Sequence, residues 1–505
     1  MRVGMVPDRV PLCPDSLDDV RKPLGMESEH EKRGVYALVR QDVENSWRPF
    51  RMGSVIESQT HRLRGTWAFR HEHRSRQRRR QSPSGHLPED IGRAFRMFGG
   101  IHGYGEATIR HGPRSTIFRA SRLFPCAGFE YGFRAMVIAH VVASFQVGGQ
   151  EAMVLELATR QRVKGHRVIA VTLEKSPPGP LQEAFTLAGI ETLQISRLGP
   201  RFDFTLPIRL ALALRRRAVE VVHVHNHSPY VYGTVAGSLL RCTVIATRHG
   251  SNERYGSPLW LRRQLSRWVD SYVAVSTEIA ENARSHGLAT EPKLTVIDNG
   301  IDLEKYTPRP EWRREVRAEF GVSDTARVIG IVGRLVEVKN VGLLLRSCLP
   351  HLGAETQLFI VGDGPERNAL ESAATQHPNG GFARFLGQRK DVARLLNGID
   401  LFALSSKIEG HPLAVIEAMA TGLPVLAPKV GGIPDMVEDG RTGFLAGLVG
   451  SAYAERLTDA LSQSASWPAM GQAGRAVAAE RFSSETMAER YLALYEQARR
   501  HRHAS

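Results

Sequence analysis

The chain has 505 residues, a formal net charge of +15 and 42% hydrophobic residues, a length and composition that suit two or three globular domains. It contains no apolar run of the roughly 18 residues that a membrane helix needs, and its start lacks the apolar segment of a signal peptide. The four cysteines lie far apart, at no metal-ligand spacing, which is typical of isolated thiols in a reducing cytoplasm.

Residues 1–135 are more basic per residue than the rest of the chain and show no sustained helical or strand periodicity. The basic run Arg74–Arg80 would suit an arm that binds nucleic acid or an anionic membrane. A second interpretation is a disordered leader without function. A third is that the natural protein starts at Met136, so that residues 1–135 are spurious. No basic groove interleaved with aromatic residues is recognisable, so we expect no nucleic-acid partner.

Strand and helix patterns alternate from Met136 onward. Apolar strands are expected at residues 137–143, 168–172, 219–225, 243–247, 271–275 and 294–297, with helical patterns between them such as 151–163. Such alternation predicts a parallel sheet with both faces covered by helices.

A second series of strands follows a proline-broken linker at residues 306–310. These strands are expected at residues 327–332, 356–361, 383–386, 400–404 and 424–427, and a long helix is expected at 484–500 with Tyr491 and Leu494 on its apolar face. The sequence therefore predicts an α/β protein with two Rossmann-like, doubly wound domains that face a cleft. The predicted units are a leader (1–135), a first domain (136–308), a second domain (309–483) and a C-terminal helix (484–500). Ligands should bind where the strands end at their carboxyl side.

The stretch Glu409–Glu417 places two carboxylates eight positions apart at the start of an expected helix, on one face. A helix N-terminus attracts phosphate, and carboxylates accept hydrogen bonds from hydroxyl groups. A nucleotide-sugar carries both groups and would suit this arrangement. The alternative is an ordinary amphipathic helix with two solvated glutamates.

Loops after two other strands carry candidate phosphate-binding groups. Gly148 and Gly149 would let the backbone approach a phosphate or a sugar closely, although glycine is also common in such loops for steric reasons. Arg334 and Lys339 follow the first strand of the second domain and could neutralise a diphosphate. The alternative for this pair is two solvated surface cations.

Two further turns would bring backbone close to a nucleoside. The glycine-rich turn at Gly362 could approach a base or a ribose, or could simply be tight. The turn at Arg389 could bind the edge of a base, with Asp391 as the N-cap of the next helix. Arg389 is equally consistent with a solvated charge.

Histidines gather at two strand ends of the first domain. His223 and His225 alternate along one strand, so they should share one face. Their spacing and the lack of a partnered carboxylate argue against a metal site. His249 ends the next strand and is expected to bind a sugar hydroxyl or the acceptor. His223 could equally be a packed core histidine.

Four stretches occur together and in order: Val296–Asp302, Gly333–Asn340, Glu409–Glu417 with the following Ala-Met-Ala, and Gly431–Asp435. With them, residues 136–500 resemble the family 4 glycosyltransferases, group 1, of the GT-B superfamily. The resemblance implies two domains that close on substrate and a C-terminal helix that crosses back onto the first domain. It also implies retaining transfer of a sugar from a nucleotide diphosphate-sugar, by front-face attack, without a cofactor or an obligatory metal.

The family pattern also implies roles for single residues. Arg334 and Lys339 would hold the diphosphate, Glu417 the ribose hydroxyls, and Glu409 and His249 would lie near the donor sugar. The implied catalytic residues are His249, Glu409, Arg334 and Lys339. The implied donor-binding residues are Gly148, Gly149, Arg334, Lys339, Gly362, Arg389, Glu409, Pro412, Leu413, Ala414, Val415 and Glu417. His411 stands where relatives more often have an apolar or aromatic residue, which bears on the identity of the donor sugar.

The resemblance implies a cytoplasmic enzyme of bacterial cell-surface polysaccharide, lipopolysaccharide or glycolipid synthesis. Its partners would be a UDP- or GDP-sugar and a sugar or lipid-linked acceptor. A nucleotide-sugar 2-epimerase on the same scaffold is the alternative function. The basic and apolar segment 206–217 could rest on an anionic inner membrane, or it could be a core-packed helix with solvated arginines.

Overall fold

The computed structural model describes residues 134–174, 179–199, 202–250 and 257–504, which all lie in one compact unit. Most of the predicted leader lies outside these ranges, including the basic run Arg74–Arg80 and the cysteines Cys13 and Cys126. Within the described ranges, no helix is both long enough and apolar enough to cross a membrane.

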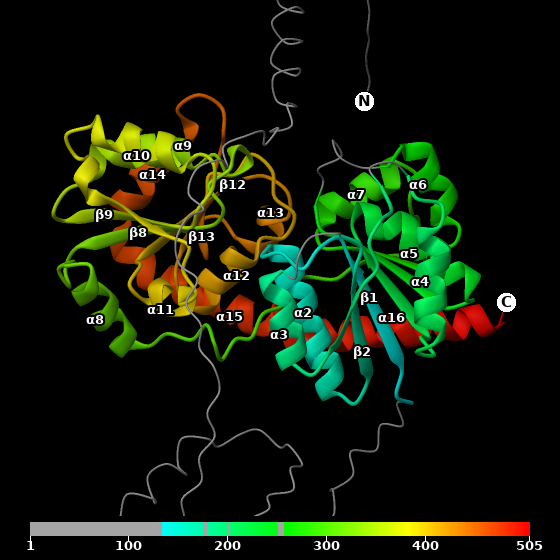
Figure 1. The fold of residues 1–505 in the computed structure, drawn as a ribbon. Coiled ribbons are helices and arrows are strands. Elements are labelled where there is room, and N and C mark those ends of the chain that lie inside the picture. Colours follow the sequence, from blue (N-terminus) through cyan, green and yellow to red (C-terminus); the bar gives the residue numbers. More distant parts are fainter. Residues whose placement is uncertain (1–133, 175–178, 200–201, 251–256, 505) are drawn as a thin grey trace, which may run out of the picture. The chain divides into compact units, whose positions relative to one another are not determined.

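The first half of the described chain builds a parallel sheet of seven strands in the order β3-β2-β1-β4-β5-β6-β7 (Figure 1). The strands are β1 Val137–Val142, β2 Arg167–Thr172, β3 Glu191–Gln194, β4 Val221–His225, β5 Thr243–Arg248, β6 Ser271–Ala274 and β7 Leu294–Val296. The helices are α2 Gly149–Val163, α3 Pro180–Leu187, α4 Leu206–Arg215, α5 His227–Leu239, α6 Leu259–Ser266 and α7 Thr277–Ser285. Because helices cover both faces, the central strands are almost wholly buried.

The second half builds a sheet of six parallel strands in the order β10-β9-β8-β11-β12-β13. The strands are β8 Arg327–Val332, β9 Thr356–Val361, β10 Ala383–Gly387, β11 Leu401–Ala403, β12 Val425–Pro428 and β13 Gly443–Ala446. The α-helices are α8 Pro310–Glu319, α9 Val341–Cys348, α10 Arg367–Thr375, α11 Val392–Asn397, α12 Leu413–Ala420, α13 Ile433–Met436, α14 Ala452–Ser462 and α15 Trp467–Arg481. Short 3-10 helices are η3 Glu337–Lys339, η4 Leu349–His351, η5 Gly380–Phe382 and η6 Ser464–Ser466.

The predicted pair of doubly wound sheets is confirmed, and each has a point where the strand order reverses. In the first sheet β1 lies between β2 and β4, and in the second β8 lies between β9 and β11. The loops that leave β1 and β8 therefore open beside a crevice at the carboxyl ends of the strands. Gly148 and Arg334 lie in these two loops.

Two strands were not predicted, β3 and β13, and both lie at the edge of a sheet. Glu191–Gln194 is a polar strand of half-buried and exposed residues, so it lacks the apolar signal of a central strand. Gly443–Ala446 is short and begins with glycine. β3 has a loop-like sequence because an exposed edge strand needs little burial. β13 is largely buried, but its four residues are too few to show a clear pattern.

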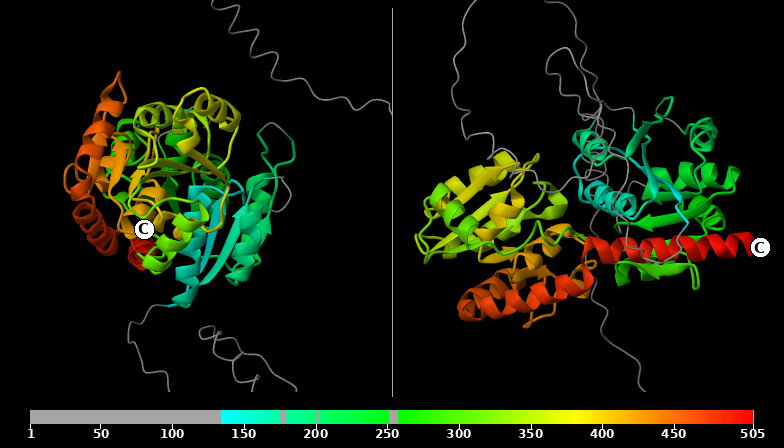
Figure 2. Two further views of the ribbon diagram at one scale, coloured as in Figure 1. Left: turned by 90° about the vertical axis from the view of Figure 1, so that its left-hand side faces the viewer. Right: turned by 90° about the horizontal axis from the view of Figure 1, so that it is seen from below.

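The last helix, α16 Ser484–Ala504, packs on the helices and strands of the first sheet (Figures 1 and 2). It extends beyond the predicted end at residue 500. Tyr491 and Leu494 are buried as predicted, and Tyr491 joins Tyr495 in a core cluster with Met153 and Leu157 of α2. The chain thus returns from the second sheet to the first.

Candidate functional site

A cleft with a volume of about 540 Å³ is lined by the carboxyl ends of strands from both sheets. Among the described residues, every predicted site residue except Val415 lines it. Those that do are Gly148, Gly149, His249, Arg334, Lys339, Gly362, Arg389, Glu409, Pro412, Leu413, Ala414 and Glu417. Val415 is buried beneath the cleft, and its N–H donates to the carbonyl oxygen of Pro412 over 3.1 Å.

The two predicted diphosphate cations differ in their surroundings. Lys339, at the end of η3, places its Nζ 2.6 Å from Glu409 Oε1, and the Glu409 side chain is only 7% exposed. Arg334 is exposed, and its guanidinium makes no hydrogen bond or ion pair with any other described residue. Its charge partly offsets the burial that raises the pKa of Glu151. Arg334 is therefore the cation in the cleft that is ready to receive an anion.

Glu409 does not lie on a helix with Glu417, and that prediction is wrong. The helix α12 begins at Leu413, and Glu409 belongs to the preceding loop. Pro412 explains the difference, because proline suits the start of a helix and disfavours helical geometry in the residue before it. The loop is fixed instead by close backbone contact, with the Gly432 N–H donating to the carbonyl oxygen of Gly410 over 2.7 Å.

The start of α12 offers free amides to the cleft. Pro412 occupies the N-cap position and provides no side-chain cap. The first N–H groups of a helix have no acceptor within the helix, so those of Leu413 and Ala414 remain for a ligand. Together with Arg334 and Lys339 they give this end of the cleft the positive charge and N–H donors that suit an anion, and we call it the anion-binding end.

Glu417 is bound by a tyrosine that sequence reasoning treated as part of a linker. Tyr306 Oη donates a hydrogen bond to Glu417 Oε1 over 2.9 Å. Burial raises the pKa of Glu417, and the hydrogen bond from Tyr306 opposes that rise. Burial and the neighbouring Glu417 also raise the pKa of Tyr306. A buried glutamate needs a donor, but its partner is 111 residues away in the sequence, so the pattern could not reveal it.

The turns at Gly362 and Arg389 have different roles in the structure. Gly362 has φ +137, and a Cβ there would lie 1.8 Å from the carbonyl oxygen of Gly333, so only glycine fits. Arg389 lines the cleft, yet its guanidinium pairs with Asp391 at 2.8 Å and with Glu319 at 3.2 Å. These carboxylates raise the pKa of Arg389. Asp391 stands at the N-cap of α11 but its side chain makes no cap, because it binds the arginine.

The other wall of the cleft comes from the first sheet. Helix α2 begins at Gly149, and no atom lies within 4 Å of where its Cβ would be, so the backbone faces open space. His249 follows β5, and burial lowers the pKa of its imidazole to about 3. His249 Nε2 lies 2.9 Å from His225 Nδ1, whereas its buried Nδ1 has no hydrogen-bond partner among the described residues. The neutral His249, which lines the cleft, therefore keeps one ring nitrogen without a partner in the described ranges.

His223 and His225 share one face, as predicted, with ring centroids 4.0 Å apart. His140 of β1, which sequence reasoning missed, completes a buried group whose potential ligand nitrogens lie within 4.8 Å of one another. Every ring nitrogen of these three histidines already has a hydrogen-bond partner. The geometry therefore favours a hydrogen-bond network over a metal centre.

His411 is buried and lines the cleft, next to two polar residues of the stretch Val296–Asp302 that had been given no role of their own. Its Nε2 lies 3.3 Å from Asp298 Oδ1, and Asn299 Nδ2 donates to its carbonyl oxygen over 2.8 Å. Burial opposes ionisation of Asp298, but His411 and two nearby arginines hold the pKa of that carboxyl below its usual value. The hydrogen bond between Asn299 and His411 therefore connects the first and second halves of the described chain beside the cleft.

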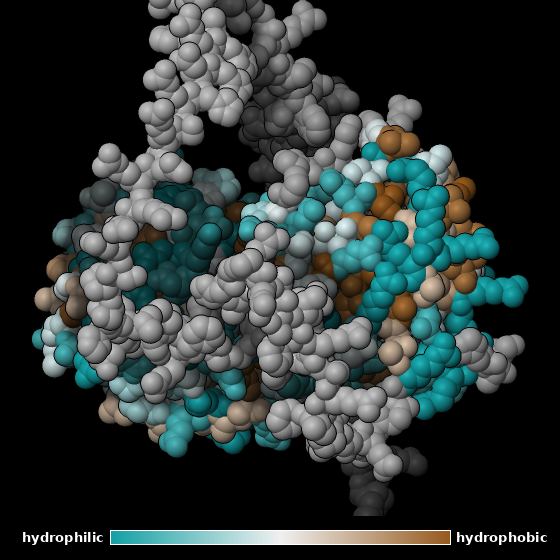
Figure 3. All heavy atoms as spheres, turned by 60° about the horizontal axis from the view of Figure 1, so that its bottom comes forward, coloured by the Kyte–Doolittle hydropathy of each residue, from teal (hydrophilic) through white to brown (hydrophobic). Residues whose placement is uncertain are grey.

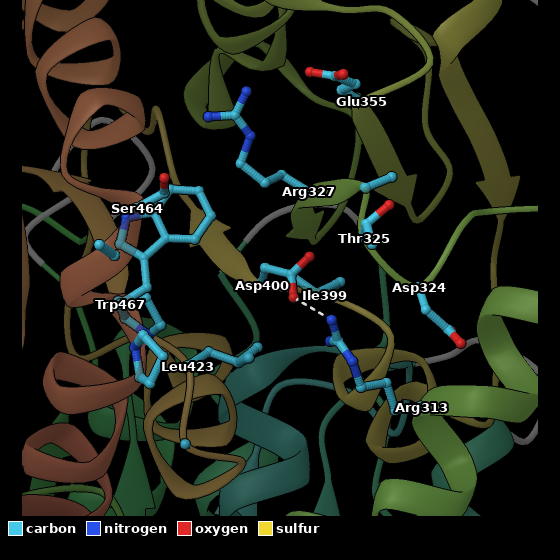
Figure 4. Close-up of a pocket in the computed structure, with 15 residues that line it drawn as sticks. Arg313, Asp324, Thr325, Arg327, Glu355, Ile399, Asp400, Leu423, Ser464 and Trp467 are labelled. Carbon is cyan, nitrogen blue, oxygen red and sulfur yellow. Dashed lines mark ion pairs between the residues drawn. The ribbon is translucent and has the colours of Figure 1, made fainter.

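A second cavity of about 820 Å³ lies at the opposite edge of the second sheet (Figure 4). It is lined at the amino ends of the strands, by Arg327 at the start of β8 and Asp400 before β11, and Arg313 Nη2 pairs with Asp400 at 2.7 Å. Doubly wound folds bind ligands at the carboxyl ends of their strands. The smaller cleft is therefore the candidate site.

Comparison with known proteins identifies the family. The profile of "Glycosyltransferase Family 4" matches residues 147–305, and that of "Glycosyl transferases group 1" matches residues 326–464. A GDP-mannose-dependent alpha-mannosyltransferase of Mycobacterium tuberculosis is 31% identical over 346 residues, which cover 64% of this chain and 87% of that protein. The N-acetyl-alpha-D-glucosaminyl L-malate synthase of Bacillus anthracis is 26% identical and covers 69% of this chain and 94% of its own length.

Solved structures show the same fold. Anabaena HepE in complex with UDP matches with a TM-score of 0.64 and 20% identity, over 72% of this chain and 100% of that one. WaaG, a glycosyltransferase involved in lipopolysaccharide biosynthesis, matches with a TM-score of 0.55 and 18% identity, over 71% of this chain and 99% of its own. With its two sheets, its cleft and both family profiles, the protein belongs to glycosyltransferase family 4, group 1, and is a transferase with the GT-B fold.

Proposed function

We propose that the protein moves a sugar, with retention of configuration, from a UDP- or GDP-sugar to an acceptor hydroxyl in bacterial cell-surface polysaccharide, lipopolysaccharide or glycolipid synthesis. The observation that carries this proposal is the anion-binding end of the cleft. There an unpaired Arg334, Lys339 and the free amides of α12 converge opposite His249. Relatives named as GDP-mannose- and UDP-galactose-dependent transferases support the choice of donors.

Each proposed role follows from the position of the group. Arg334, Lys339 and the amides of Leu413 and Ala414 bind the diphosphate, and Glu417 accepts hydrogen bonds from the ribose. The acceptor hydroxyl attacks from the side of the leaving group, and the departing phosphate oxygen takes its proton. The cations then stabilise the charge that grows on the phosphate. No cofactor and no obligatory metal enter this scheme.

The remaining predicted contacts keep supporting roles in the proposal. Gly148 and Gly149 bring backbone to the diphosphate and the acceptor, and Gly362 lets the chain pass close to the nucleoside. Arg389 contributes through the backbone of its turn, because its side chain pairs with Asp391 and Glu319. Glu409 positions Lys339 beside the donor sugar.

The first test is the thermal stabilisation of the full chain by UDP, GDP and ADP at saturating concentration. A ligand that binds only the folded state must raise the melting temperature. Stabilisation by UDP or GDP identifies the base, and no stabilisation by any of the three would contradict the diphosphate site. Once a donor is found, NMR of the product must show the same anomeric configuration as the donor. A changed sugar without acceptor would instead indicate a nucleotide-sugar 2-epimerase.

We also propose the division of the chain into an acceptor domain (136–308), a nucleotide-sugar domain (309–483) and the crossing helix (484–500), preceded by a dispensable leader. Comparing full-length protein with residues 136–505 tests it. Equal melting temperatures and equal nucleotide binding are expected. A fragment that fails to fold would show that the leader belongs to the enzyme.

We further propose a cytoplasmic location with peripheral contact to an anionic inner membrane, through α4 and the segment before it. Leu206, Leu210 and Leu214 are buried in the core, but Ile208 on the other side of the helix is 56% exposed and Phe204 is 80% exposed. Arg215 and Arg216 are exposed at its end. Figure 3 shows hydrophobic residues (brown) beside hydrophilic ones (teal) on its right-hand side, which is the half formed by the first sheet and its helices. Apolar side chains flanked by arginines suit the surface of an anionic bilayer.

Vesicle flotation tests the membrane contact. Binding to vesicles that contain phosphatidylglycerol, but not to phosphatidylcholine vesicles, is expected. Replacing Phe204 and Ile208 with serine should weaken it. The control is Leu187→Ser, because Leu187 is 82% exposed on a different helix. Flotation that is absent, or equal for both variants, would remove this surface as the docking site.

A further inference from the structure

A continuous line of hydrogen bonds runs from the cleft into the core of the first sheet. His249 Nε2 lies 2.9 Å from His225 Nδ1, and His225 Nε2 lies 3.1 Å from His140 Nδ1. His140 Nε2 lies 2.8 Å from Gln161 Oε1, and Gln161 Nε2 lies 3.2 Å from the hydroxyl of Tyr495 on α16. The line thus joins the cleft to the C-terminal helix.

The histidines in this line are uncharged around neutral pH. Burial lowers the pKa of His140 to about 4 and of His249 to about 3, and it lowers the pKa of His225 well below its usual value. A neutral imidazole has one N–H donor and one nitrogen that only accepts. Each histidine in the line must therefore donate in one direction and accept from the other.

Gln161 sets the direction. Its contact with Tyr495, at 3.2 Å, is long for an O–H···O bond but ordinary for an amide N–H donor. The Tyr495 hydroxyl can then donate to His223 Nδ1, 2.7 Å away. The Gln161 oxygen consequently faces His140, and because a carbonyl oxygen only accepts, the proton of His140 lies on Nε2.

The same step repeats along the line. His140 Nδ1 accepts from His225 Nε2–H, and His225 Nδ1 accepts from His249 Nε2–H. The nitrogen left over is His249 Nδ1, which is buried and has no hydrogen-bond partner among the described residues. His249 itself lines the cleft.

We propose that Gln161, His140, His225 and Tyr495 are positioning residues that hold His249 in the Nε2–H form, so that Nδ1 accepts a hydrogen bond from a hydroxyl of the donor sugar. This deepens the proposed function and rests on it. The site selects a sugar that has a free hydroxyl at this place. A deoxy sugar cannot donate there, and an acceptor-only group such as a fluorine would meet a lone pair.

The tautomer can be observed directly. Full-length protein with 15N-labelled histidine is studied by NMR, and His249→Gln identifies the signal of His249. A non-protonated Nδ1 in the wild type is expected. A protonated Nδ1 would overturn the proposal, because it would mean that the line runs in the opposite direction and presents a donor.

Two variants test the role of the line. Gln161→Met removes the terminal acceptor, and Tyr495→Phe removes the hydroxyl that orients the amide, so the His249 signal should become a mixture of tautomers. Tyr453→Phe is the control. It removes a buried tyrosine hydroxyl of α14, beside the second sheet, which donates to the carbonyl oxygen of Leu404 over 2.6 Å and not to this line. An unchanged His249 signal in both test variants, or an equal change in the control, would contradict the assignment.

Binding separates this inference from the proposed function. Tyr495→Phe should lower the affinity for the nucleotide-sugar by about three- to tenfold, which corresponds to the loss of one neutral hydrogen bond. It should leave the affinity for the free nucleoside diphosphate unchanged. Equal losses for both ligands would overturn the inference. Failure of the wild type to bind any nucleotide would instead contradict the proposed function.

Discussion

Substituting Lys339 or Arg334 should affect the stability of the protein differently, although we propose that both residues serve turnover. Lys339→Ala leaves Glu409, whose side chain is only 7% exposed, without its cation. Removing one partner of a fully buried ion pair costs about 3–5 kcal/mol of stability. The cost should be smaller here, because the Lys339 side chain is 25% exposed. We expect a loss of about 1–3 kcal/mol. At about 2–4 °C per kcal/mol for a domain of this size, the melting temperature should fall by several degrees.

Arg334→Ala should leave the melting temperature nearly unchanged. The Arg334 side chain is exposed and has no hydrogen bond or ion pair with the described residues, and surface substitutions of this kind usually change stability by less than about 0.5 kcal/mol. Turnover should nevertheless fall by about 10² or more in both variants, by analogy with the loss of a donor that stabilises transition-state charge.

The assay pairs thermal melting with turnover of the preferred donor. The double variant Lys339→Met with Glu409→Gln is the control, because removing both charges abolishes the unpaired glutamate. It should recover most of the lost stability and none of the turnover. Near-normal turnover in both single variants would refute the diphosphate assignment. An equal fall in melting temperature for Arg334→Ala and Lys339→Ala would refute the account of the ion pair.

Three further outcomes follow from single contacts. Glu417→Gln should weaken donor binding more than it lowers the maximal rate, measured by titration and initial rates, and unchanged affinity would argue against the ribose role. Gly362→Ala should destabilise by about 2 kcal/mol or more, through its φ of +137 and its contact with Gly333, whereas Gly381→Ala, with open space around it, should be tolerated. Burial lowers the pKa of His140 to about 4, so on acidification the unfolded protein binds a proton at this histidine before the folded protein does. The free energy of unfolding should therefore fall as the pH drops from about 6.5 toward 4. The expected slope is about 1.4 kcal/mol per pH unit for each such histidine. Equal denaturation midpoints at pH 7.5 and 5.5 would contradict a neutral histidine cluster.

The sequence was most informative where local pattern and fold agree. Buried β-branched strands such as Val137–Val142 and Thr356–Val361 predicted both sheets, because parallel strands must be apolar on both faces. Loops that end such strands then meet at one edge, which is why Arg334, Lys339 and His249 could be named before their distances were known. Glu409 was misplaced because Pro412 starts the helix later than the carboxylate spacing suggested.

Residues that act through distant partners escaped prediction. Tyr306 reaches Glu417 across 111 positions, and His140 reaches His225 across 85. Nothing in the local sequence marks a linker tyrosine as a donor to a buried carboxylate, or a strand histidine as part of a network. Buried polar groups need partners, but only the fold determines which partners are near.

The contacts within the cleft also bear on how its charges would act on a diphosphate. Lys339 is held by Glu409, and Glu417 by Tyr306, so both protein groups are satisfied before a ligand arrives. A diphosphate must compete with Glu409 for Lys339, which makes the ground-state gain from this cation small. As the sugar bond breaks, charge grows on the phosphate while Glu409 keeps its charge, and the balance at Lys339 shifts toward the phosphate. In the proposed reaction we therefore expect Lys339 to act mainly on the rate, because only attraction that is stronger in the transition state accelerates the reaction. For Arg334, which has no such competitor in the described chain, we expect an effect on binding as well.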